Sequence, residues 1–214
     1  LKKNVKILMK FDKELLNKLT NFRRELHRFP ELSKQEVKTQ QRLHDFLSPL
    51  NPTTIIKDIG GYGLAYVFDS EKPGDTVLFR GDMDALPISE SNQFGYVSEN
   101  EGVAHLCGHD GHMAVLSGLA YLIDKSPPKK GRVVLLFQPA EETGEGAELV
   151  VNDIKFKEIY PDYSFAFHNL PGFEKKAVCV KNGSFASAST GMIINLKGLS
   201  SHAAHPEDGN NPDQ

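Results

Sequence analysis

The sequence contains only two cysteines in 214 residues and has no long run of apolar residues. Two cysteines cannot build the disulfide framework that small secreted proteins use. Apolar stretches such as Val133–Phe137 are far shorter than the roughly 18 residues that cross a bilayer. The chain opens with Lys2, Lys3, Lys6 and Lys10, where a secretory signal would have an apolar segment. We therefore expect a cytoplasmic protein without a membrane partner.

A strong excess of either charge is also missing. The chain has 25 Lys and Arg against 28 Asp and Glu, which gives a net charge of −3, and its pI is near 6.3. This balance gives no electrostatic basis for binding nucleic acid or an anionic membrane surface. With 39% hydrophobic residues and a mean hydropathy of −0.37, the chain has the composition of a soluble globular protein with a sizeable core. A small molecule is the expected partner.

Hydrophobic spacing predicts two helices near the start of the chain. Apolar residues three and four positions apart predict an amphipathic helix from about Asp12 to Arg28, ending before Pro30. After it, Ser33-Lys34-Gln35-Glu36 fits a capping box for a second helix that stops near Pro49–Pro52. These two helices open the domain.

The patterns that follow alternate between strands and helices. The predicted strands are Thr53–Lys57, Leu64–Phe68, Thr76–Arg80, Arg132–Gln138 and Ser164–His168, and the predicted helices are Met113–Lys125 and Gly146–Asn152. This alternation is typical of an α/β fold with a largely parallel sheet covered by helices on both faces. The pattern changes near Ala186, where Ser187–Leu196 predicts a long strand, so we place a domain boundary there.

The densest group of chemically active residues is Cys107–His112, in a loop that leads into the helix predicted from Met113. A thiolate at Cys107 and an imidazole at His109 can reach one borderline-soft divalent ion, and Gly108 lets the backbone bend around it. The alternative is a buried free cysteine packed beside a loop histidine. This group alone leaves both interpretations open.

Further candidate ligands follow predicted strands. Glu141 and Glu142 come after the strand that ends at Gln138, and His168 ends another strand. In parallel α/β sheets, ligands bind at the carboxyl ends of the strands. One carboxylate can ligate a cation while its neighbour transfers a proton. The alternatives are an acidic helix start for the two glutamates and a hydrogen bond to a backbone carbonyl for His168.

Asp82 and Asp84 follow a third predicted strand. Such carboxylates can orient a ligand imidazole from behind, although in turns they also accept local backbone hydrogen bonds. Three strand ends and one helix start thus offer ligand-type residues, and this convergence favours a divalent-metal site over separate local explanations. Cysteine with histidine suits Zn²⁺, while mixed carboxylate and imidazole ligation also admits Mn²⁺, Co²⁺ or Ni²⁺.

Five motifs resemble, in order and spacing, those of the M20 metallopeptidase family, and within it the amidohydrolase branch of hippurate hydrolases, N-acetyl-diaminopimelate deacetylases and auxin-conjugate hydrolases. They are Arg80–Pro87, Cys107–His112, Gln138–Glu142, His168-Asn169 and Gly198–Pro206. The resemblance implies a zinc-peptidase-like catalytic, metal-binding domain over residues 1–185 and the start of an α+β lid and dimerisation domain over residues 186–214. It also implies two divalent metal ions, a small-molecule N-acyl amino acid as substrate, and a homodimer formed through the lid.

The resemblance also assigns roles to single residues. Carried over by motif, the metal ligands are Cys107, His109, Glu142 and His168. Glu141 is then the general acid/base, Asp84 orients a ligand, and His202 polarises the substrate carbonyl. The implied reaction is hydrolysis of the amide bond of N-acyl amino acids, or a carboxypeptidase-like or dipeptidase-like relative of it.

Members of the family are much longer, and the resemblance implies one more histidine ligand beyond Gln214. We therefore expect impaired hydrolysis by a chain of these 214 residues. Two alternatives stay open: a metal-binding remnant without turnover, and a metal-free scaffold in which Cys107 is a buried structural thiol.

Overall fold

The computed structural model describes residues 12–186 and 192–212. Contacts divide the chain into two compact units, Leu1–Leu170 and Pro171–Gln214. The functional division expected near Ala186 stays a prediction.

Five strands form one sheet in the order β1-β2-β4-β3-β5. Their bounds are β1 Thr54–Ile59, β2 Gly63–Asp69, β3 Thr76–Asp82, β4 Arg132–Gln138 and β5 Tyr163–Ala166. Strand β3 runs parallel to β4 and β5, whereas β2 runs antiparallel to β1 and β4. The expected α/β class with a helix-covered sheet is confirmed: β1, β3, β4 and β5 run in the same direction, and β2 runs against them, which makes the sheet mixed. The three residues between β1 and β2 are enough for an antiparallel hairpin, whereas a parallel pair needs a crossover of a dozen or more.

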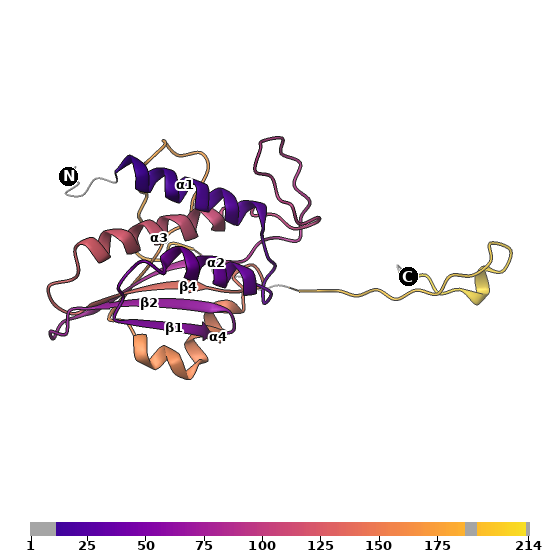
Figure 1. Cartoon of the computed structure of the whole chain (residues 1–214). Helices are drawn as coiled ribbons and strands as arrows, with labels where there is room; N and C mark the ends of the chain where they lie inside the picture. Colours follow the sequence, from indigo (N-terminus) through magenta and orange to yellow (C-terminus); the bar gives the residue numbers. More distant parts are fainter. Residues whose placement is uncertain (1–11, 187–191, 213–214) are drawn as a thin grey trace. The chain divides into compact units, whose positions relative to one another are not determined.

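Helices cover both faces of this sheet (Figure 1). On one face lie α1 Lys13–Arg28, α2 Val37–Leu47 and α3 His109–Lys125, and on the other lie α4 Gly146–Asn152 and the 3-10 helix η1 Ile154–Ile159. Side chains alternate along a strand, so Tyr66 packs into the core under α1–α3 while its neighbour Val67 packs into the core against α4 and η1. Two apolar cores therefore hold β3, β4 and α3, whose ends carry most of the candidate site.

The ends of the first two helices show where local signals succeed and fail. Asp12 caps α1, because its side chain accepts a 2.7 Å hydrogen bond from the amide of Leu15. The capping box predicted for α2 is wrong, since Glu36 occupies the N-cap position without a side-chain cap. Ser33 donates instead to Asp84 at 2.6 Å, and Glu36 accepts from the amide of Ala140 at 2.8 Å. Both side chains therefore form hydrogen bonds with loops that are distant in sequence.

The second unit contains the 3-10 helix η2 Pro206–Asp208 and an isolated antiparallel bridge between Leu199 and Asn210. The strand predicted over Ser187–Leu196 begins outside the described residues, and its remainder, Met192–Leu196, is not in a strand. Within residues 171–186 and 192–212 no neighbouring strand supplies the ladder of hydrogen bonds that a strand needs. Among the helices of the described residues, none is both long enough and apolar enough to span a membrane.

Candidate metal centre

The carboxyl ends of the three parallel strands meet at one edge of the sheet. Asp82, the last residue of β3, pairs with Gln138, the last residue of β4, and β5 ends beside them at Ala166. The segments that follow these strands carry Asp84, the Glu141–Glu142 pair and His168. The chain returns to this edge a fourth time where α3 begins at His109. The strand-end placement expected from the sequence is therefore the observed one.

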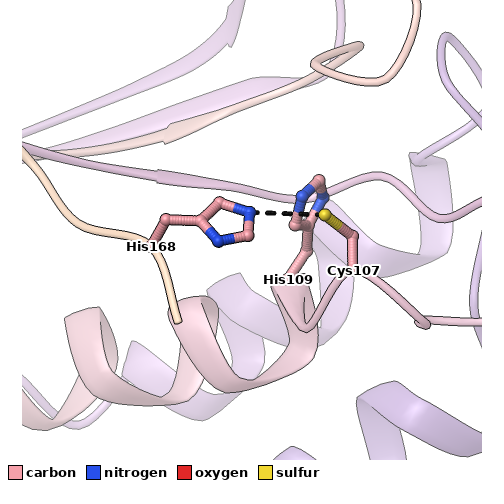
Figure 2. A group of neighbouring side chains, drawn as sticks. All are labelled: Cys107, His109 and His168. Carbon is pink, nitrogen blue, oxygen red and sulfur yellow. Dashed lines mark hydrogen bonds between the residues drawn. The ribbon is translucent and has the colours of Figure 1, made fainter. Parts of the chain in front are cut away.

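Cys107, His109 and His168 come together at this edge, as Figure 2 shows. Their ligand atoms all lie within 4.8 Å of one another, and Cys107 Sγ is 3.3 Å from His168 Nε2. Burial, with a further contribution from the charge of Glu142, raises the pKa of the Cys107 thiol to about 12. A metal ion binding here would therefore displace the thiol proton.

Both histidines are held in the tautomer that a metal ligand needs. His109 Nδ1 donates to the backbone carbonyl of Asp84 at 2.8 Å, and His168 Nδ1 donates to the backbone carbonyl of Asn169 at 2.7 Å. Each ring therefore keeps its lone pair on Nε2, which is the atom that faces the cluster. His109 Nε2 is fully buried and has no hydrogen-bond partner. Such an atom fits a site built for a cation.

Glu141 and Glu142 approach the same nitrogen from the loop after β4. Glu141 Oε2 is 3.7 Å and Glu142 Oε1 is 3.6 Å from His109 Nε2, so these three residues form a second candidate ligand group. The carboxyl of Glu142 is the more buried of the two, with 18% of its side chain exposed against 37% for Glu141. Burial, together with the nearby charges of Glu141 and Asp84, raises the pKa of Glu142. A cation here would relieve this crowding of negative charge.

Asp84 lies behind both groups and organises them. Its Oδ2 accepts hydrogen bonds from Ser33 Oγ at 2.6 Å and from the amide of Glu142 at 2.9 Å. Burial would raise its pKa, but interactions with His109, Ser33 and the Glu142 amide outweigh burial and lower the pKa of Asp84 to about 2. Its orienting contact with His109 runs through the backbone carbonyl, because Oδ1 is 3.5 Å from the ring nitrogen.

Sequence reasoning missed a third group, formed by Asp82, His109 and His112. His112 Nδ1 lies 2.6 Å from Asp82 Oδ1, and His112 Nε2 lies 2.6 Å from Asn169 Oδ1. Asp82 is also paired with Arg80 at 2.9 Å. The spacing of three between His109 and His112 places both rings on one face of α3, and this spacing was the available signal.

Gly108 makes the close approach of these segments possible. Its φ of +95° is a left-handed conformation, and a Cβ at this position would lie 2.5 Å from Asn169 Oδ1. Glycine is the residue that meets both requirements without strain. The glycine expected to bend the backbone around the site therefore also admits the loop that carries His168.

His202 belongs to the second unit. Its side chain is exposed, and its Nδ1 accepts a 3.1 Å hydrogen bond from the amide of Ala204. The carbonyl-polarising role expected from the resemblance stays a prediction.

Cys, His and Glu side chains at the carboxyl edge of a helix-covered sheet define a candidate divalent-metal protein. The sequence profile of Peptidase family M20/M25/M40 matches residues 78–207, and the chain belongs to this family. The family expected from the motifs is therefore confirmed.

The chain is also similar to individual members of the family, in sequence and in structure. N-acetyldiaminopimelate deacetylase of Priestia megaterium is 37% identical over 195 residues, which cover 91% of this chain and 52% of the relative. N-acetyl-L-cysteine deacetylase of Bacillus subtilis is 36% identical over 207 residues, covering 92% and 47%. Among solved structures, the YXEP protein of Bacillus subtilis, a dinuclear metal binding peptidase from the M20 family, matches with a TM-score of 0.70 and 34% identity over 76% of this chain and 45% of that chain. The chain spans about half the length of the curated relatives that it matches.

Proposed function

We propose that the chain carries the metal centre of a metal-dependent amidohydrolase that cleaves the amide bond of N-acyl amino acids, as a deacetylase does. The observation that carries the proposal is at His109, whose Nε2 is buried without a hydrogen-bond partner and which belongs to all three groups of ligand-type side chains. The deacetylase relatives support the choice of an N-acyl amino acid as substrate.

The donor set fits divalent ions. Cys107, His109, Glu142 and His168 would hold them, and a thiolate with two imidazoles suits Zn²⁺, while the carboxylates also admit Mn²⁺, Co²⁺ or Ni²⁺. The dinuclear relative supports two ions. When bound, such ions lower the pKa of water and polarise a substrate carbonyl.

The two adjacent glutamates have surroundings that suit different tasks. Glu142 is the more buried, and its amide is tied to Asp84, so it suits a fixed ligand. Glu141 is more exposed, so its carboxylate can take a proton from the attacking water and return it to the leaving amine. Asp84 fixes the ring of His109, and His202 would stabilise the developing charge on the substrate oxygen.

We also propose a substrate, a cellular compartment and a segment through which two copies pair. The partner is a small-molecule N-acyl amino acid in the cytoplasm, and residues 186–214 begin the segment through which two copies pair.

Two glutamine variants test the division of labour. Glu142→Gln should lower the bound metal per chain, measured by elemental analysis after gel filtration. Glu141→Gln should keep the metal and, in a version of the protein extended to the full length of its relatives, should lower the turnover of N-acetyl amino acids by roughly 10²–10⁴-fold. Glu145→Gln, which removes an exposed carboxylate paired with Lys34, is the control and should change neither quantity.

The outcomes separate the possible functions. Equal metal loss in the Glu141 and Glu142 variants would contradict the assigned roles. A chain that binds no metal and whose Cys107 resists alkylation, as a buried structural thiol does, would instead favour the metal-free scaffold. Metal binding without turnover in the extended protein, assayed with both N-acetyl and N-benzoyl amino acids, would favour a binding remnant.

A further inference from the structure

The turn that presents Glu141 and Glu142 has an unusual backbone. Ala140, the residue before them, has a φ of +52°, which is a left-handed conformation. A residue with a Cβ adopts this conformation at a cost, and it persists only where surrounding interactions hold it. Ala140 is fully buried, so the interactions that hold it come from the protein interior.

One side chain from a distant segment holds this residue. Glu36 Oε1 accepts a 2.8 Å buried hydrogen bond from the amide of Ala140, across 104 positions of sequence. The carbonyl of Ala140 accepts from the amide of Gly146 at 2.9 Å, which closes the turn from the other side. Glu36 is itself fully buried, so the bond is protected from competing water.

The connection between α1 and α2 that carries Glu36 also supports the loop after β3. Ser33 donates to Asp84, and the carbonyl of Glu31 accepts from the amide of Ala85 at 2.8 Å. Asp84 in turn accepts from the amide of Glu142. One short connection therefore fixes both loops that bring carboxylates to His109.

We propose that Glu36 is a positioning residue that holds Ala140 in its left-handed conformation and thereby directs Glu141 and Glu142 toward His109. The effect of Glu36 on metal binding rests on the proposed function, whereas its effect on the backbone of Ala140 does not. Burial raises the pKa of Glu36, and its Oε2 has no hydrogen-bond partner. The contact through which Glu36 acts is thus the hydrogen bond that Oε1 accepts from the amide of Ala140.

A double-mutant cycle tests this role on the whole chain, with Co²⁺ alone as the probe. Glu36→Ala should weaken Co²⁺ binding, followed by visible absorption, by roughly 10–100-fold, as loss of a residue that supports a metal ligand typically does. Adding Ala140→Gly should restore most of the affinity, because glycine adopts a positive φ without a holding contact. Glu36→Gln keeps an acceptor at the same place and should stay within about threefold of wild type, well below that loss.

Glu31→Ala is the matched control. The Glu31 carboxylate lies in the same connection and accepts hydrogen bonds from Thr39, but it makes no bond to Ala140. Its loss should lower thermal stability without changing Co²⁺ affinity. Equal loss of affinity in the Glu31 and Glu36 variants, or failure of Ala140→Gly to restore it, would overturn the positioning role.

A second measurement does not depend on metal. The φ angle of Ala140, obtained from NMR chemical shifts of the metal-free chain, should leave the left-handed region in Glu36→Ala and stay there in Glu36→Gln. An unchanged φ in Glu36→Ala would overturn the proposal by itself. Absence of Co²⁺ binding by the wild-type chain would overturn the metal centre, and with it the metal-directing part of the role, while the NMR result would still decide the backbone part.

Discussion

A buried charge cluster behind the metal-binding loop should make a large contribution to stability. His27, on α1, places Nδ1 at 2.8 Å from Asp110 Oδ2 and Nε2 at 3.0 Å from Glu90 Oε1. Since both ring nitrogens face carboxylate oxygens, both carry protons and the ring is charged. The hydrogen bond to Asp110, helped by Glu90, outweighs burial and raises the pKa of His27. The perturbation to make is His27→Ala.

The structure sets the size of the effect. Removing His27 leaves Asp110 and Glu90 with side chains only 0% and 2% exposed. Removing one partner from a buried ion pair costs about 3–5 kcal/mol. Asp110 keeps Arg23 at 2.6 Å, and Glu90 keeps the amide of Ser98 at 2.7 Å. We therefore expect the low end of the range, about 3 kcal/mol of unfolding free energy, out of a typical total of about 5–15 kcal/mol.

Urea unfolding followed by circular dichroism, in EDTA at about pH 6, measures this loss as a drop in the midpoint of about 1–3 M. The pH dependence provides a second measurement. Because folding raises the pKa of His27, its contribution is fully present below about pH 6.5, the unfolded value, and disappears as pH rises through the folded value. Asp110 and Glu90 have lowered pKa values, so their contributions disappear only toward acid pH.

Wild type should therefore lose stability as pH rises above about 6.5, through a step that His27→Ala lacks. His44→Ala is the control, because the ring of His44 faces the hydroxyl of Tyr66 and no carboxylate. A loss of unfolding free energy below about 1 kcal/mol in His27→Ala would refute the reasoning, and so would the same loss of stability at alkaline pH in wild type and in His27→Ala.

Two further predictions concern the metal-binding loop. Gly108→Ala should lower the unfolding free energy, measured in urea, by at least about 2 kcal/mol, because the alanine keeps a positive φ and also displaces Asn169. The control is Gly102→Ala, at a φ of +73° with open space around the added Cβ, which should cost only about 1 kcal/mol. Equal losses in the two variants would argue against the predicted steric contact with Asn169. Chelation should lower the melting temperature of the zinc-loaded chain, by an amount equivalent to about 2.7 kcal/mol for zinc at a hundred times its Kd, and an unchanged calorimetric transition would contradict metal binding by the folded state.

Local patterns predicted the elements of the fold and not their pairing. The bounds of β4 and α4 agree with the prediction, because apolar periodicity is a property of the segment itself. The reversed direction of β2 depends on which strands lie beside it, and the alternation of strands and helices along the chain does not reveal them. The strand predicted near Met192 failed for the same reason, since a strand exists only with a partner.

In the candidate site too, local patterns revealed single residues but not their distant partners. Residues with ligand chemistry at a helix start or after a strand, such as Cys107 and His168, could be recognised from residue type and position. Ser33 and Glu36 could not, because their partners lie far away in sequence and their local pattern fits a capping box equally well. His112 was missed although its spacing from His109 was visible, since the choice between ligand and support depends on what its second nitrogen meets.

The position of His109 at the centre of all three ligand groups limits how ions can share the site. An imidazole nitrogen has one lone pair, so an ion bound through Nε2 in one group excludes binding through it in the other two. Of two ions, one would sit beside sulfur and nitrogen and the other would rely on carboxylate oxygens, which different metals prefer. Two bound ions would thus favour an unlike pair, a softer ion next to Cys107 and a harder one next to Glu142, and elemental analysis of protein loaded from mixed metals would detect that asymmetry.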